Sequence, residues 1–401
     1  MRNTTVAIDI GSSTVRVVVG EFTKGSKEDQ KNPKIVGIGE AETEGLRHGF
    51  VVDGDKAEIS LKKAIDMAEK SSGIRIRSAL VSVGGTSLRG EASTGSVIVS
   101  KADGEVTNLD INKALEDCEN NLNLNNKKII HSFPISFKLD GKEVFGRLEG
   151  MRGTKLEVRA LLVTYSMQHL EDLIGVISSL GIETTDIIAS PIAASLIALS
   201  PKQKIVGVAL VNIGSETVSL CVFENELPVA IHTFSIGSTD ITNDIALGFK
   251  IPLELADRLK MGNSEGGFSP PKADQLRADK KKLDEIIEAR LSDIFELIEN
   301  HLKKIKRAEL LPAGIVFTGG GANTKGLEEL SKSVLKLPAS LGATEIFGSS
   351  KTKLRDSAWF TVLGLLLSAR ENGGYEKTGS LGKIFKDLKN TIKSSLKQLM
   401  P

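Results

Sequence analysis

The sequence is poor in cysteine, in aromatic residues and in any excess of charge. Only two of its 401 residues are cysteines, Cys118 and Cys221, and they lie far apart with no CxxC spacing. This argues against a disulfide scaffold or a thiolate metal site and fits a reducing compartment. Aromatic residues make up 4%, which leaves few rings for stacking on single-stranded nucleic acid. Lys and Arg number 52 against 51 Asp and Glu, so the net charge of +1 supplies no general attraction to nucleic acid.

Long apolar runs are missing as well. No stretch reaches the roughly 18 residues of a membrane span. Asp9 interrupts the apolar segment near the N-terminus, so we expect no secretory signal there. The five histidines are scattered without ligand spacing, so we expect no histidine metal site. At this length the chain predicts two or three domains.

Two distant segments share one strand–turn–strand pattern, and we interpret them as an internal duplication. The first covers residues 6–22 around the motif IDIGSST (8–14), and the second covers 209–224 around VNIGSET (211–217). When the segments are aligned, Asp9 falls on Asn212. The identical pairs are Ile10/Ile213, Gly11/Gly214, Ser12/Ser215, Thr14/Thr217, Val15/Val218, Val19/Val222 and Glu21/Glu224.

Each turn has the chemistry of a phosphate-binding loop. Glycine lets the backbone approach a ligand, and consecutive N–H groups and hydroxyls can donate to phosphate oxygens. The Asp9 carboxylate can hold the water shell of Mg²⁺. One such hairpin alone would be an ordinary tight turn, but two copies and a third glycine-rich strand end favour a phosphate site. That third segment, TGGGAN (318–323), does not complete GxGxxG because Thr324 takes the last position, and the sequence contains no Walker A motif.

Periodicity predicts the elements between these motifs. We expect helices over 55–71, 168–180 and 190–199, an amphipathic helix within 273–311, and strands over 79–83, 157–165 and 313–318. We expect a loop over 262–271 and a flexible linker over 371–379.

The motifs IDIGSST, VNIGSET and IVFTGGGANTKG (315–326) resemble the phosphate-1, phosphate-2 and adenosine motifs of the superfamily that contains actin, heat-shock chaperones and sugar kinases. Within it, the chain resembles the FtsA family of bacterial cell-division actin homologues over essentially its whole length. Further matches are HGFVVD (48–53), LVSVGGTSLRG (80–90), residues 237–260 and the closing amphipathic segment. The resemblance implies an α/β, two-lobed actin-like ATPase fold of duplicated RNase H-like domains, with a small inserted α+β domain.

The resemblance also implies a division of the chain. The expected parts are a lobe 1 core (1–83, 163–190 and 357–372), an inserted domain (84–162), a lobe 2 core (191–234 and 311–356), a lobe 2 subdomain (235–310), a linker (373–379) and a membrane helix (380–401).

From the same resemblance we expect a protein that binds ATP with Mg²⁺ between the lobes and polymerises with itself. It would bind the C-terminal peptide of the tubulin-like protein FtsZ and tether the FtsZ ring to an anionic membrane, at the cytoplasmic face of the division site. The inserted domain would contact other division proteins. No nucleic acid partner is expected.

The nucleotide site that the resemblance implies has three parts. Phosphate-binding residues would be Asp9, Gly11, Ser12, Ser13, Thr14, Asn212, Gly214, Ser215, Glu216 and Thr217. Adenosine- or ribose-binding residues would be Gly319, Gly320, Gly321, Asn323, Asp257 and Lys260, although the helix that carries the last two could equally be a solvated face. Asp9 would hold Mg²⁺ through water.

Three departures from the family pattern predict slow or absent hydrolysis. Asn212 stands where the second motif usually has Asp, Glu216 adds a carboxylate near the phosphates, and Ser190 stands where relatives carry a water-positioning carboxylate. The loss of an oriented base typically slows a reaction ~10²–10⁴-fold. We therefore assign no catalytic residue.

The last segment predicts a membrane-binding amphipathic helix. Its apolar stripe is Leu381, Ile384, Phe385, Leu388, Ile392, Leu396 and Leu399, and its basic face is Lys383, Lys386, Lys389, Lys393 and Lys397. Lysines at an anionic surface contribute about 1 kcal/mol each. A core helix or a coiled-coil strand is the alternative.

Two other functions are compatible with the sequence. A PilM-like pilus assembly adaptor would share the fold and the insertion but would not need its own lipid-binding helix. A small-molecule kinase of the same superfamily would need a catalytic carboxylate near the γ-phosphate, and both Asn212 and Ser190 count against it.

Overall fold

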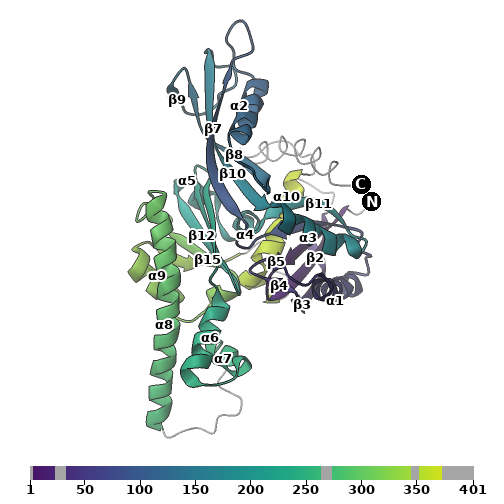
Figure 1. Ribbon diagram of the computed structural model, residues 1–401, viewed down its shortest axis with the longest axis vertical. Helices are drawn as coiled ribbons and strands as arrows, with labels where there is room; N and C mark the ends of the chain where they lie inside the picture. The colour runs from purple at the N-terminus through teal and green to yellow at the C-terminus, as the bar shows by residue number, and fades with distance from the viewer. Residues whose placement is uncertain (1–2, 23–32, 263–272, 345–351, 373–401) are drawn as a thin grey trace.

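A five-stranded sheet forms the centre of the first lobe (Figure 1). The computed structural model describes residues 3–22, 33–262, 273–344 and 352–372. The sheet order is β11-β6-β1-β2-β3, with bounds β1 (Asn3–Ile10), β2 (Thr14–Phe22), β3 (Lys34–Glu42), β6 (Ser78–Val83) and β11 (Glu183–Ala189). Val, Ile and Leu side chains on both faces are buried, as expected for a sheet covered by helices. Helices α1 (Gly54–Ser72), α3 (Met167–Ser179) and α10 (Phe360–Asn372) contact it, as does α4 (Ser190–Ala198).

The second lobe repeats this arrangement with the order β14-β13-β12-β15-β16. Its strands are β12 (Val208–Ile213), β13 (Val218–Glu224), β14 (Leu227–Phe234), β15 (Ile315–Thr318) and β16 (Ala339–Leu341). Its helices are α5 (Pro201–Val206), α6 (Ser238–Phe249), α7 (Leu253–Lys260), α8 (Ala273–Lys304) and α9 (Leu327–Leu335). In each lobe a hairpin is followed by a parallel neighbour of its first strand: β1 pairs with β6, and β12 with β15.

The long amphipathic helix is confirmed as α8, whose stripe from Ile287 to Leu302 is buried in the lobe 2 core. The apolar pattern predicted a helix as far as residue 311, but α8 ends at Lys304. Lys306 and Glu309 both have a φ of 59°, which turns the chain out of the helix. Leu311 is still buried, from the loop that follows, and this explains why the apolar pattern outlasts the helix.

Helices α4 (Ser190–Ala198) and α10 cross between the two sheets. Their close approach needs a glycine, because a Cβ atom at Gly364 would lie 1.8 Å from the carbonyl oxygen of Ala193. Through this crossing, the lobe 1 core extends to residues of β12 and β13 in lobe 2. The crossing therefore holds the two lobes together at the base of the cavity described below.

A third sheet forms the inserted α+β domain, which projects from the two lobes at the top of Figure 1. Its order is β7-β10-β8-β9, with bounds β7 (Arg89–Ile98), β8 (Lys127–Leu139), β9 (Lys142–Val144) and β10 (Lys155–Ser166). Helix α2 (Asn108–Asn120) covers it and closes a small separate core. A two-stranded hairpin, β4 (Leu46–Arg47) with β5 (Phe50–Val51), completes the sheets of the described residues.

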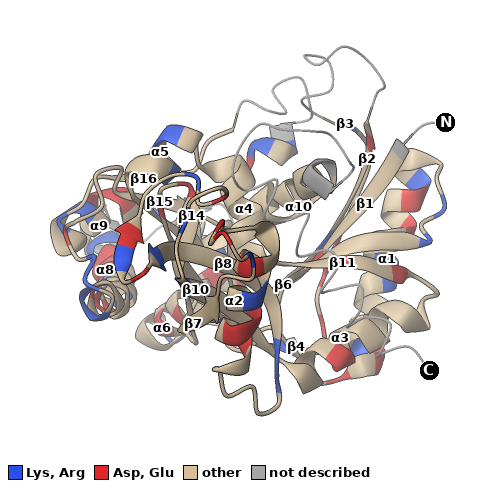
Figure 2. Ribbon diagram, turned by 90° about the horizontal axis from the view of Figure 1, so that it is seen from above, with Lys and Arg blue, Asp and Glu red and all other residues tan. Residues whose placement is uncertain are grey.

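Charges of both signs are interspersed along α1, α2 and α8 (Figure 2), in keeping with the balanced composition. Among the described residues, no helix has the length and apolar character needed to cross a membrane. The predicted linker 373–379 and helix 380–401 lie outside the described residues, as does nearly all of the predicted loop 262–271.

Candidate functional site

The two predicted hairpin turns have the same backbone geometry. In lobe 1 the N–H of Gly11 donates to the carbonyl of Thr14 at 3.1 Å, and in lobe 2 the N–H of Gly214 donates to the carbonyl of Thr217 at 2.8 Å. The strand registers correspond as well, since Ile10 pairs with Val15 and Ile213 with Val218. The predicted duplication is therefore confirmed in the structure.

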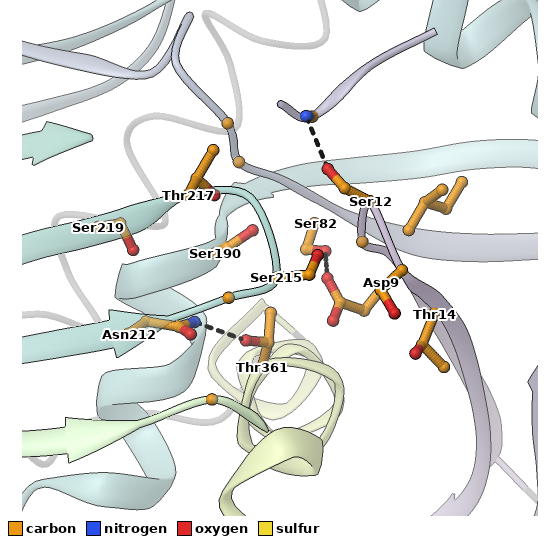
Figure 3. A pocket seen from close by; sticks show the side chains of 18 of the residues that line it. Asp9, Ser12, Thr14, Ser82, Ser190, Asn212, Ser215, Thr217, Ser219 and Thr361 are labelled. Atoms are coloured by element: carbon orange, nitrogen blue, oxygen red, sulfur yellow. Dashed lines mark hydrogen bonds between the residues drawn. The ribbon is translucent and has the colours of Figure 1, made fainter. Parts of the chain in front are cut away.

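Both turns and the triple-glycine segment line one cavity of about 220 Å³ between the lobes (Figure 3). Strands β1 and β12 both end at this cavity, so the residues that follow each strand face the same space. The predicted residues that line it are Asp9, Gly11, Ser12, Ser13, Thr14, Asn212, Gly214, Ser215, Thr217, Gly319, Gly320 and Gly321.

Two of the three glycines allow close packing against β12, and the third leaves open space. Gly319 has a φ of 88°, and a Cβ atom there would lie 2.3 Å from Oδ1 of Asn212. A Cβ atom at Gly321 would lie 2.4 Å from Cγ2 of Ile213, so both glycines are needed for packing against β12. Gly320 is exposed, and a Cβ atom there would meet nothing within 4 Å. Its bare backbone leaves room for a ligand.

Asp9 is the only acidic residue among the described residues that line the cavity. The Ser82 hydroxyl on the neighbouring strand β6 donates to Oδ1 of Asp9. Burial raises the pKa of the Asp9 carboxyl, while this hydrogen bond and the positive charge of Arg16 oppose the rise. Arg16 itself is paired with Glu40 at 3.1 Å. A cation or a hydrogen-bond donor brought into the cavity would favour the ionised form of Asp9.

Several hydroxyl residues of the cavity were not among the predicted site residues. They include Ser82, Ser219, Ser238 and Thr361, and the hydroxyl of Thr361 accepts from Nδ2 of Asn212 at 3.4 Å. Ser82 and Ser219 are polar residues within otherwise apolar strands, and this was the one sequence feature that pointed to them. Ser190, noted in the sequence as a departure from the family pattern, lines the cavity as the first residue of α4.

Two predicted ligands point elsewhere. Asn323 does not line the cavity, and its Nδ2 donates to Oδ1 of Asp356 at 3.3 Å. Glu216 lies between two cavity-lining residues, but its carboxylate is directed to Arg47 and His48 of lobe 1. The positive charge of Arg47 therefore offsets the repulsion that we expect between the Glu216 carboxylate and a bound phosphate.

Asp257 and Lys260 on α7 also lie outside the cavity lining. The Lys260 ammonium contacts Asp257 at 2.8 Å and donates to the hydroxyl of Thr242 at 2.7 Å. It also donates to the carbonyl of Ser238, a residue of the cavity wall, at 3.2 Å. Lys260 thus contacts the outer side of a residue that lines the cavity but does not line the cavity itself.

The described residues contain no group of three or more His, Cys, Asp or Glu residues placed to hold a metal ion. A transition-metal site of protein ligands is therefore not formed by them. Mg²⁺ differs, because it commonly keeps several waters and binds through one or two carboxylates together with phosphate oxygens. The single carboxylate of Asp9 fits that kind of site.

The duplicated lobes, the cavity between them and the crossed helices α4 and α10 define the actin-like ATPase fold. Solved structures of that class match most of the chain. The PilM–PilN type IV pilus biogenesis complex aligns with a TM-score of 0.66 and 16% identity over 91% of this chain and 98% of the other. MreB5 of Spiroplasma citri bound to ADP aligns with a TM-score of 0.50 and 13% identity over 92% and 100%.

Family comparison gives a narrower result. The model for cell division protein FtsA matches residues 209–364, and the model for the SHS2 domain inserted in FtsA matches 85–164. FtsA of Bacillus subtilis is 31% identical over 379 residues, covering 92% of this chain and 83% of that protein. FtsA of Pseudomonas aeruginosa is 29% identical, covering 90% and 88%. The chain belongs to the FtsA family of cell division proteins, and both the resemblance and the expected fold are confirmed.

Proposed function

We propose that this chain binds ATP with Mg²⁺ in the cavity between its lobes. One observation carries the proposal: two matched glycine–hydroxyl turns, one from each lobe, line the same cavity together with a single carboxylate. Phosphates would be held by Gly11, Ser12, Ser13 and Thr14 of lobe 1 and by Gly214, Ser215 and Thr217 of lobe 2, with Asn212 beside them. The adenosine would lie along Gly319–Gly321, where Gly320 leaves the backbone open. The ADP bound to the structurally similar MreB5 supports the same choice of ligand.

Mg²⁺ would be held by Asp9 through water. The metal supplies positive charge to the phosphates when it is bound. Asp9 fits this role because, among the described residues, its half-buried carboxyl accepts a side-chain hydrogen bond from Ser82 alone and so retains acceptor capacity toward the cavity.

Hydrolysis would be slow or absent. No second carboxylate and no histidine line the described part of the cavity, so a water molecule there has no general base other than Asp9. Bound ATP would then act mainly by setting the conformation and promoting self-assembly into filaments. A turnover of several ATP per minute by the purified protein would contradict this proposal.

The cellular role would be that of a tether at the division site. We propose that the filament binds the C-terminal peptide of FtsZ and attaches it to the cytoplasmic face of the membrane through residues 380–401. The basic amphipathic pattern of that segment supports the membrane contact, and many copies in a filament would add avidity. The inserted domain would bind other division proteins.

Co-sedimentation with anionic vesicles tests the tether. The full chain, a truncation that ends at Gly379 and Gly320→Leu would each be mixed with vesicles, with FtsZ, and with or without Mg-ATP. We expect the full chain to pellet FtsZ, more so with ATP, and the truncation to stay in the supernatant. Gly320→Leu should pellet without any increase from ATP. Gly175→Leu is the matched control, because Gly175 is also exposed and a Cβ atom there meets nothing within 4 Å.

The pilus-adaptor alternative has one specific support, the similarity to the PilM–PilN complex, which at 16% identity concerns the fold alone. An adaptor of that kind would not need residues 380–401 for its membrane contact. If neither the full chain nor the truncation pellets with vesicles, the tether is wrong and the adaptor becomes the better proposal. Transfer of phosphate from ATP to a small-molecule acceptor would instead favour the kinase alternative.

A further inference from the structure

The tip of the β4–β5 hairpin, Arg47 to Gly49, lies between the two turns that line the cavity. His48 has a φ of 50° and Gly49 a φ of 86°, and these two residues form the tight turn between paired Arg47 and Phe50. The carbonyl of His48 accepts from the N–H of Thr86, which fixes the tip against the start of the inserted domain. The tip is therefore held in place where lobe 1 meets the inserted domain.

Toward lobe 1, the tip orients a hydroxyl of the first turn. The N–H of Gly49 donates to Oγ of Ser12 at 3.0 Å, an interaction drawn in Figure 3. A serine hydroxyl that accepts one hydrogen bond still has its own proton to donate. Ser12 can therefore present that proton to an acceptor in the cavity.

Toward lobe 2, the tip makes three contacts with a single residue, Glu216. The N–H of His48 donates to Oε2 at 2.6 Å, and Nε of Arg47 lies 3.2 Å from Oε1. Nδ1 of His48 lies 3.1 Å from the carbonyl oxygen of Glu216. Because a carbonyl only accepts, Nδ1 carries the proton in this contact.

The Glu216 carboxylate lies close enough to the cavity for its negative charge to affect phosphate binding. It lies between Ser215 and Thr217, both of which line the cavity, and its side chain is only 14% exposed. A carboxylate so little exposed is poorly screened by water, so it would repel phosphate groups a few ångströms away. The cation that pairs with it is Arg47, which is 68% exposed and comes from the other lobe.

We infer that Arg47 is a positioning residue that neutralises Glu216 and so permits phosphate groups to bind at the second turn. This inference rests on the proposed function, since it concerns the affinity of the same cavity for ATP. It explains how the chain can carry Glu216 in a phosphate-binding turn. The ion pair also joins the tip of the β4–β5 hairpin to the second turn.

A charge cycle tests the inference. ATP and AMP affinities would be measured with Mg²⁺ for the full-length wild type, Arg47→Gln, Glu216→Gln and the double variant. We expect Arg47→Gln to weaken ATP binding about five- to tenfold. It should change AMP binding less than twofold, because AMP lacks the β- and γ-phosphates. Glu216→Gln should bind ATP at least as tightly as the wild type, and the double variant should return to within twofold of it.

The rescue separates a charge effect from a merely structural one. If the double variant is as weak as Arg47→Gln, or if Arg47→Gln binds ATP like the wild type, the inference is wrong. Arg75→Gln is the control for removal of an exposed arginine outside the cavity lining.

A nucleotide-free measurement keeps the two proposals distinguishable. Hydrogen exchange at the His48 amide, whose N–H donates to Glu216, should be faster in Glu216→Ala, which removes the acceptor, than in the wild type. If the wild type binds no ATP but this exchange difference is present, the proposed function fails while the contact stands. An unchanged exchange rate would contradict the contact itself.

Discussion

The turn of lobe 1 and the turn of lobe 2 have the same backbone and different chemistry. Both close with the same glycine-to-threonine hydrogen bond, and both face the same cavity. Lobe 1 places a carboxyl, Asp9, at the end of its strand, whereas lobe 2 places the neutral Asn212 there. One residue past the shared Ser, lobe 1 has Ser13 and lobe 2 has Glu216.

This difference shows which properties of a duplicated unit can change. The turn depends on a backbone hydrogen bond and on a glycine with a carbonyl about 3 Å from where its Cβ would be, so these are the same in both copies. The two carboxylates near the turns are stabilised by residues from elsewhere in the chain. The Ser82 hydroxyl donates to Asp9, and Arg47 forms an ion pair with Glu216. We therefore expect lobe 1 to supply the metal contact and lobe 2 to supply neutral donors.

The largest predicted effect comes from removing the polar group in each lobe separately. Asp9→Ala should weaken binding of Mg-ATP about 100-fold, because hydrogen bonds to a charged group contribute about 1.5–3 kcal/mol. Asn212→Ala should weaken it less than about fivefold, because a neutral hydrogen bond contributes about 1 kcal/mol or less. Titration calorimetry with and without Mg²⁺ measures both. Equal losses in the two variants would show that the lobes do not differ in the way we describe.

A smaller effect is expected from making the lobes chemically alike. Asn212→Asp places a carboxylate in the second turn, where the Thr361 hydroxyl can donate to it. We predict a rise in ATP turnover of about tenfold, below the ~10²–10⁴-fold typical of a positioned general base because Ser190 remains in place of a carboxylate. Asn225→Asp is the control, since Asn225 lies in the exposed turn after β13. No change in a phosphate-release assay would argue against the missing base as the cause of slow hydrolysis.

The smallest effect concerns stability without nucleotide. The pKa of Asp9 is raised in the folded protein, so folding is opposed by its ionisation at neutral pH. The folded state binds the extra proton, and its stability therefore falls as pH rises above the unfolded-state pKa. Asp9→Asn removes the cost of ionising this carboxyl in the folded protein and should raise Tm by about 1–2 °C at pH 7. The difference should shrink toward pH 4 in a thermal scan, and a difference that grows on acidification would contradict it.

Local patterns in the sequence predicted the hairpins, the glycine segment and the buried stripe of α8, because each depends on residues close in sequence. The gathering of Ser82, Ser219 and Thr361 at one cavity could not be predicted in this way, since it depends on which strands and helices lie side by side. The direction of the Glu216 side chain could not be predicted for the same reason, because it is set by Arg47 and His48 from another segment.

The site residues expected from the family resemblance also show that position in the sequence does not determine where a side chain points. Lys260 and Asp257 share one helix face, as their spacing predicts, but they pair with each other behind the cavity wall. Asn323 follows the glycine segment yet pairs with Asp356. Proximity in sequence to a binding motif therefore did not place these side chains in the cavity.

The most direct test of the central claim is a crystal structure of the full chain with Mg²⁺ and a non-hydrolysable ATP analogue. We predict that the phosphates lie between the Gly11–Thr14 and Gly214–Thr217 turns, with Mg²⁺ and its waters beside Asp9. A nucleotide bound elsewhere, or phosphates that contact only one of the two turns, would contradict the claim that the duplicated turns form a single site.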